Sequence, residues 1–203
     1  HLDGSLTLKL AYALAQDRQL IASDCTLEQI RERIVVGRDN GSLNEFLARF
    51  ELPIAILQDE EALVLCTREL VKTLALQGLE YVELRFAPQF HTLDGMTQEE
   101  AVQAAIAGLK DAPIPANLIL CCMRGSGNMA ANEETLRLVR KHLPGGVVCA
   151  IDLAGAEALF PTSDYAGLFE QARAQQIPMT IHAGEAAGPE SIRQALSFGT
   201  KRI

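Results

Sequence analysis

The chain has 203 residues, of which 48% are hydrophobic and 22% are charged, a balance typical of a soluble globular protein with a sizeable core. The formal net charge is -8 and no block of basic residues occurs, so we expect no nucleic-acid-binding surface. No apolar run approaches the roughly 20 residues that cross a bilayer, so we expect no membrane-spanning segment.

The cysteines indicate a reducing compartment. They are odd in number, lack C-x-x-C spacing, and mostly lie among Leu, Ile and Val. We therefore predict reduced, buried thiols in a cytoplasmic protein and no cysteine-ligated zinc site. The five residues are Cys25, Cys66, Cys121, Cys122 and Cys149.

The amino-terminal part of the chain is predicted to be mostly helical. The sequence S-L-N-E at residues 42–45 matches a capping box, which predicts the start of a helix. An apolar stripe follows at the spacing of one helical face: Leu43, Phe46, Leu47 and Phe50. The spacing leaves two interpretations open, part of the core or a lid over a flat apolar ligand.

Four short apolar segments are predicted to be buried strands, because each is rich in Val, Ile or Leu and is bounded by Gly, Pro or Asn. They cover residues 81–86, 117–123, 147–153 and 179–182. Stretches with helical periodicity cover residues 63–76, 101–109, 133–142, 165–175 and 190–198. Strand and helix thus alternate at intervals of roughly 30 residues, as in βαβ units with a parallel sheet.

A doubly wound sheet and a (β/α)8 barrel both fit this alternation. No G-x-G-x-x-G or G-x-x-x-x-G-K-[ST] motif follows the strands, which weakens the nucleotide-binding fold. In Y-V-E-L-R-F and A-I-D-L-A-G the polar side chains share one strand face. This pattern favours barrel strands whose inner face carries a polar network.

A histidine ends the last predicted strand and a glutamate follows three residues later, in T-I-H-A-G-E. Gly184 would allow a tight turn, so that Glu185 can face the same cavity as His182. An imidazole beside a carboxylate suits metal-assisted hydrolysis, in which one binds zinc and the other moves a proton. A hydrogen-bonded structural histidine is the alternative. His1 and Asp3 form a similar pair at the start of the chain.

Four blocks occur in a fixed order along essentially the whole chain. They are H-L-D-G-S, Y-V-E-L-R-F-A-P, A-I-D-L-A-G-A-E and T-I-H-A-G-E-A-A-G-P-E-S-I-R-Q-A-L. Together they resemble the adenosine deaminase family of the metal-dependent amidohydrolase superfamily. The resemblance implies a (β/α)8 TIM barrel with a helical insertion after the first strand, one Zn2+ ion, and a purine nucleoside as small-molecule partner.

The resemblance also implies roles for particular residues. His1 and His182 match zinc ligands, and Glu185 matches the acid that protonates the purine ring. Asp3 matches the acid that contacts the sugar, and the Gly155 backbone amide matches a donor to a ring nitrogen. The apolar stripe resembles the helix that covers the base: Leu43, Phe46, Leu47 and Phe50.

The implied reaction is the zinc-dependent hydrolytic deamination of adenosine to inosine, and of 2'-deoxyadenosine to its deoxy form. Zinc lowers the pKa of a bound water and supplies a hydroxide near neutral pH. Attack on the ring at C6 develops negative charge, so a neutral Glu185 in a dry pocket would have to donate a proton.

The chain departs from the family pattern by omission. The first histidine of the H-x-H zinc motif would precede His1, and the chain stops at Ile203, before the family's glycine-histidine-glycine stretch and its later aspartates. About five of the eight barrel strands are recognisable, counting a stub at His1 and a beginning at residues 202–203. We therefore expect residues 1–203 to be an incomplete deaminase domain that is inactive and binds zinc weakly or not at all.

Two alternatives remain open. The parent protein could act on free adenine or another aminopurine, although Asp3 favours a nucleoside because adenine-specific relatives tend to carry Glu at the matching place. The chain could also be a non-catalytic remnant that binds purines or partners, against which the retained Asp3, His182 and Glu185 argue. The sequence does not predict the oligomeric state.

Overall fold

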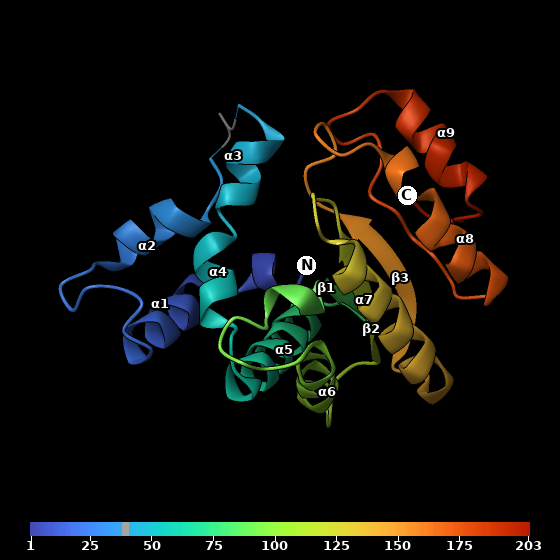
Figure 1. Ribbon diagram of the computed structural model, residues 1–203. Helices are drawn as coiled ribbons and strands as arrows, with labels where there is room; N and C mark the ends of the chain where they lie inside the picture. The colour runs from blue at the N-terminus through green and yellow to red at the C-terminus, as the bar shows by residue number, and fades with distance from the viewer. Residues whose placement is uncertain (38–40) are drawn as a thin grey trace. The chain divides into compact units, whose positions relative to one another are not determined.

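The described residues, 1–37 and 41–203, form two structural units, and helices dominate the first (Figure 1). In the computed structural model this first unit comprises His1–Phe86 and Phe90–Ala116, and the second comprises Ala87–Gln89 and Asn117–Ile203. The elements up to the start of the second unit's sheet are η1 (Asp3–Ser5), α1 (Leu8–Asp17), α2 (Leu27–Ile34), α3 (Leu43–Ala48), α4 (Glu51–Ile56), α5 (Glu60–Leu76), β1 (Val82–Phe86), η2 (Pro88–Phe90) and α6 (Gln98–Gly108).

The amino-terminal part is mostly helical, as predicted, since α1 to α5 precede β1. Its longest helix, α5, begins at Glu60 because Asp59 caps it: Oδ1 accepts a hydrogen bond from the Ala62 amide at 2.7 Å. The Asp59 carboxylate also pairs with Arg18 at 2.8 Å, which ties α5 to the end of α1. Near the start of the chain, the Leu2 amide donates to the Arg85 carbonyl at 2.8 Å, so the backbone next to His1 lies alongside β1.

The spacing predicted that the apolar stripe at residues 43–50 lies on one helix, and this prediction is wrong. The helix start is correct, because Ser42 Oγ accepts from the Glu45 amide at 3.2 Å. However, α3 ends at Ala48 and α4 begins at Glu51. The break follows from Pro53, which lacks an N–H and whose ring would clash with the carbonyl four residues earlier in a continuous helix.

The four stripe side chains are half-buried, so the core interpretation is wrong for them. Because the helix breaks, Pro53 lies in the first turn of α4, where a proline is tolerated, and not inside a continuous helix. The rings of Phe46 and Phe50 face each other across the break, edge to face, with centroids 5.3 Å apart.

A parallel pair of strands forms the centre of the second unit. β2 (Ala116–Met123) pairs with β3 (Val148–Ala154), with Cys121 opposite Asp152 and a register shift between Leu118 and Ile119. Both strands were predicted to within one residue of their ends. The remaining elements are α7 (Met129–His142), η3 (Leu143–Gly145), η4 (Thr162–Tyr165), α8 (Ala166–Ala174) and α9 (Pro189–Ser197).

The core of this unit lies between the strands and α7, which runs alongside β3 (Figure 1). Strand side chains with no exposed surface include Leu118, Ile119, Ile151 and Leu153. Burial on both faces explains why these strands read as continuous apolar runs. Among the described residues, no helix combines the length and the apolar character that a membrane span requires.

The fourth predicted strand, at residues 179–182, forms backbone hydrogen bonds with β3, but its pairing is limited to isolated β-bridges and it is not a regular strand. The Thr180 amide donates to the Ile151 carbonyl and the His182 amide donates to the Leu153 carbonyl, both at 3.0 Å. A further bridge joins Thr180 to Arg202, where the next strand was expected to begin. His182 therefore lies beside the carboxyl end of β3, the end at which barrel enzymes place catalytic groups.

Candidate active site

The buried carboxylate of Asp152 holds the imidazole of His182. Nδ1 of His182 lies 2.9 Å from Oδ2 and 3.1 Å from Oδ1 of Asp152. The same carboxylate accepts from the Leu153 amide at 2.8 Å and from Cys121 Sγ at 3.4 Å. The Asp152 side chain is fully buried, whereas that of His182 is 22% exposed.

This arrangement fits a metal ligand. Metal-binding histidines typically donate one ring N–H to a carboxylate, which fixes the tautomer and orients the ring. Here it is Nδ1 that faces Asp152. The sequence placed Asp152 on a polar strand face but did not pair it with His182.

The turn after His182 depends on Gly184, as predicted. Its φ is +80°, a conformation that favours glycine, and a Cβ there would lie 2.6 Å from Cδ1 of Ile192. Glu185 follows this turn and its side chain is exposed. The described residues therefore do not supply the dry surroundings expected for Glu185.

A carboxylate that the sequence analysis did not single out, Glu157, lies beneath this turn. Oε1 accepts from the Gly184 amide at 2.8 Å and from the Ser191 hydroxyl. Oε2 accepts from the amides of Ala186 at 2.7 Å and Ala187 at 3.1 Å. Glu157 is 2% exposed, so water does not replace these donors.

These contacts set the acidity of Glu157. Burial alone would raise the pKa of its carboxyl, but hydrogen bonds from Ser191, Ala186, Gly184 and Ala187 outweigh burial and lower the pKa from 4.5 to about 2. The ionised form is therefore the one that the folded protein stabilises.

A pH dependence of stability follows. Because the folded-state pKa of Glu157 lies below its unfolded value, its stabilisation is complete above pH 4.5 and is lost as the pH falls towards about 2. We expect the free energy of unfolding, measured relative to Glu157→Gln by denaturant titration, to fall by about 3 kcal/mol over this window. A difference between the two proteins that stays constant across the window would contradict this expectation.

Arg124, which is 4% exposed, connects His182 to the same region. One guanidinium nitrogen donates to the Phe160 carbonyl at 2.7 Å. The other donates to Thr162 Oγ1 at 2.9 Å and to the His182 carbonyl at 2.7 Å. Thr162 Oγ1 lies 2.7 Å from Ser191 Oγ, which closes a chain of hydrogen bonds from His182 to Glu157.

Gly155 directly follows β3 and has a φ of +108°. A Cβ there would press against Met123 Cε at 3.3 Å and against Arg124 at 3.4 Å. A side chain at this position would therefore be strained, which agrees with a role for its backbone.

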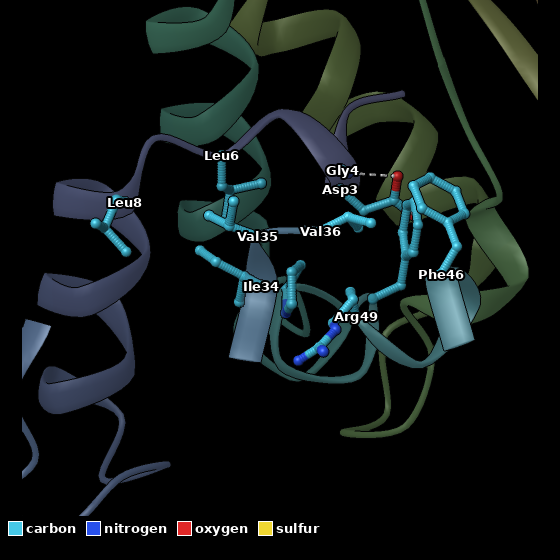
Figure 2. A pocket seen from close by; sticks show the side chains of 11 residues that line it. Asp3, Gly4, Leu6, Leu8, Ile34, Val35, Val36, Phe46 and Arg49 are labelled. Carbon is cyan, nitrogen blue, oxygen red and sulfur yellow. Dashed lines mark hydrogen bonds between the residues drawn. The ribbon is translucent and has the colours of Figure 1, made fainter. Parts of the chain in front are cut away.

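The remaining predicted residues lie in the first unit, which contains a cavity of about 270 Å³ (Figure 2). Asp3, Phe46 and Phe50 line it, whereas Leu43 and Leu47 are not among the described residues that do so. The rest of the lining is largely apolar and includes Leu6, Leu8, Ile34, Val35 and Val36.

Asp3 places a carboxyl group at this apolar cavity. It is 5% exposed, and burial raises the pKa of its carboxyl. Its Oδ1 accepts from the Gly4 amide at 3.0 Å, the dashed line in Figure 2. The His1 ring lies edge-on to Phe50, with centroids 6.4 Å apart. A cavity with aromatic walls and a polar group suits a flat ligand that carries hydroxyls.

The predicted zinc ligands belong to different units, His1 to the first and His182 to the second. Within residues 1–37 and 41–203, no group of three or more His, Cys, Asp or Glu side chains is placed to hold a metal ion. In the second unit, the two predicted polar strand-end groups His182 and Asp152 form a pair.

Comparisons with known proteins identify the family of this chain. The family model described as adenosine deaminase matches residues 1–203. The adenosine deaminase of Haemophilus ducreyi is 46% identical over 211 residues, an alignment that covers 100% of this chain and 61% of that protein. The chain thus spans about three fifths of the length of the curated relatives that it matches.

Solved structures show the same fold. The adenine deaminase of Arthrobacter aurescens superposes with a TM-score of 0.81 at 25% identity, over 100% of this chain and 62% of that one. An amidohydrolase from Burkhoderia ambifaria with bound Zn superposes with a TM-score of 0.79 at 20% identity, over 100% and 56%. These likenesses confirm the predicted α/β class and partial barrel, and together with the family match they establish that the chain belongs to the adenosine deaminase family.

Proposed function

We propose that the complete protein containing this chain hydrolyses adenosine and 2'-deoxyadenosine, taking up water and releasing ammonia to leave inosine or its deoxy form. The observation that carries this proposal is the pairing of His182 with Asp152 at the end of β3. Glu185 follows His182 by three residues. Membership of the family and the 46% identity to a Haemophilus ducreyi adenosine deaminase support it.

In this proposal His182 would bind Zn2+ through Nε2 while Asp152 holds Nδ1, and His1 would be a second ligand. When bound, the ion would supply a hydroxide nucleophile near neutral pH. Glu185 would donate a proton to the purine ring, which relieves the negative charge that develops as C6 is attacked. Gly155 would orient the ring through its backbone amide.

The apolar cavity of the first unit would receive the nucleoside. The buried Asp3 carboxyl would accept a hydrogen bond from a sugar hydroxyl, and the aromatic edge at Phe46 and Phe50 would cover the base. Leu43 and Leu47 would extend this apolar cover outside the cavity itself. We place residues 1–203 in one deaminase domain, as proposed from the sequence.

We also infer a cytoplasmic enzyme whose partner is a small purine rather than a nucleic acid or a membrane. All five cysteines are thiols in the described structure, which fits a reducing compartment. The net charge of -8 disfavours binding to a polyanion.

Substrate choice tests the proposal. The Arthrobacter aurescens structure is that of an adenine deaminase, so adenine is the competing substrate. We expect the complete protein to release ammonia from adenosine with a kcat/KM at least about 10-fold above that for adenine, because the free base leaves the buried group placed for a sugar hydroxyl unpaired. Asp3→Ala is expected to reduce this ratio of kcat/KM values, because it removes that group.

Faster turnover of adenine would instead make the free base the substrate. Binding of purines without any ammonia release would indicate a non-catalytic purine-binding protein.

A further inference from the structure

We propose that Glu157 is a positioning residue: its buried carboxylate fixes the backbone of residues 184–187 and thereby places Glu185 for catalysis. This inference rests on the proposed deaminase function of the same site. Neither the sequence motif nor the comparisons assign a role to Glu157.

The four donors to Glu157 lie on both sides of Glu185. The Gly184 amide donates to Oε1, and the amides of Ala186 and Ala187 donate to Oε2, at 2.7 to 3.1 Å. The Glu185 side chain itself is exposed. Its position is therefore determined by the backbone that Glu157 holds.

A carboxylate suits this position better than any other side chain. Its two oxygens accept without donating, and here they meet three backbone amides and the Ser191 hydroxyl. Successive amides that converge on an anion form a site that stabilises negative charge. A carboxamide would turn an N–H2 group towards one pair of donors, so at most two of the four hydrogen bonds would remain.

The hydrogen bonds between Arg124 and Glu157 all run in one direction. Arg124 donates to Thr162, and the Ser191 hydroxyl donates to Glu157. The proton between Thr162 and Ser191 must then come from Thr162. Each hydroxyl thus accepts one hydrogen bond and donates one, in a row that leads from a guanidinium to a carboxylate.

The same network reaches the other predicted site residue in this unit. Arg124 donates to the His182 carbonyl at 2.7 Å as well as to Thr162. The backbone of His182 and the backbone around Glu185 are consequently held by one connected set of buried groups. Glu157 is the anion at which this set ends.

The test compares Glu157→Gln with Glu190→Gln in the complete protein. Glu190 is an exposed carboxylate in the first turn of α9 that pairs with Arg193, so its variant removes the same charge close by without touching the turn. Hydrogen–deuterium exchange of residues 184–187 is expected to accelerate about 10- to 100-fold in Glu157→Gln and to change less than about twofold in Glu190→Gln.

Kinetics supply the second readout. In Glu157→Gln we expect kcat for adenosine to fall about 10- to 100-fold with KM and zinc content near wild type, because a misplaced acid weakens the transition state more than ground-state binding. Unchanged exchange at residues 184–187, or unchanged kcat, in a folded Glu157→Gln protein would overturn the proposal.

A second variant, Ser191→Ala, and the exchange measurement in the wild type cover the cases in which Glu157→Gln does not fold or the protein is inactive. If Glu157→Gln does not fold, Ser191→Ala removes one donor and leaves the carboxylate; faster exchange at residues 184–187 then supports the proposal and unchanged exchange overturns it. If the wild-type protein deaminates no adenosine, the proposed function fails, whereas the exchange measurement still decides whether Glu157 fixes this turn.

Discussion

Replacing Glu185 with Gln in the complete protein is expected to lower kcat for adenosine about 100- to 10,000-fold, the usual contribution of a positioned general acid. The amide keeps the size of the side chain but carries no acidic proton for the purine ring. Within residues 1–203 the Glu185 side chain is exposed, so its replacement removes no buried contact with the described residues. Zinc content and thermal stability should therefore remain at wild-type values.

Single-turnover kinetics and metal analysis of the purified variant check this expectation. Glu190→Gln is again the matched control, since it removes an exposed carboxylate five residues along the chain and should leave kcat unchanged. Near-wild-type turnover by Glu185→Gln would refute the acid role. Loss of zinc together with activity would show that Glu185 acts on the metal site instead.

The regular elements of the second unit followed from local sequence. β2 and β3 are buried on both faces, so their apolar runs and the glycines and prolines that bound them were sufficient to locate them. The segment at residues 179–182 was located in the same way, although its pairing is limited to bridges. The turn at Gly184 was also predictable, because it follows from the properties of a single residue.

The apolar stripe shows where periodicity fails. Leu43, Phe46, Leu47 and Phe50 satisfy helical spacing, but the spacing ignores Pro53, which lies beyond the stripe and breaks the helix before Phe50. The proline was visible in the sequence and its position could have corrected the prediction.

The polar network of the candidate site could not be predicted. Glu157 meets donors that are 27 to 34 residues later in the chain, and Arg124 meets the carbonyl of His182 at a separation of 58 residues. Such pairings depend on how loops fold at the ends of strands, on which hydrophobic periodicity carries no information. An acid at the end of A-I-D-L-A-G-A-E was the one available signal for Glu157.

Asp152→Asn in the complete protein is expected to weaken zinc binding about 10- to 100-fold and to lower kcat with it, the usual effect of removing a carboxylate behind a metal-binding histidine. Asp152 accepts hydrogen bonds from His182, from the Leu153 amide and from Cys121. An asparagine can keep its oxygen on the Leu153 amide only by turning its N–H2 group towards the other two groups.

That rotation changes the tautomer of His182. The N–H2 group would lie 2.9 Å from Nδ1, nearer than the amide oxygen at 3.1 Å, which favours Nδ1 as an acceptor and moves the ring proton towards Nε2, the nitrogen that we propose binds the metal. Zinc titration against a competing chelator measures the effect, with Cys121→Ala as the control that keeps the carboxylate and removes the thiol contact. Equal zinc affinity in Asp152→Asn and in the wild type would show that Asp152 does not set the tautomer, and the His182–Asp152 pair would then be structural.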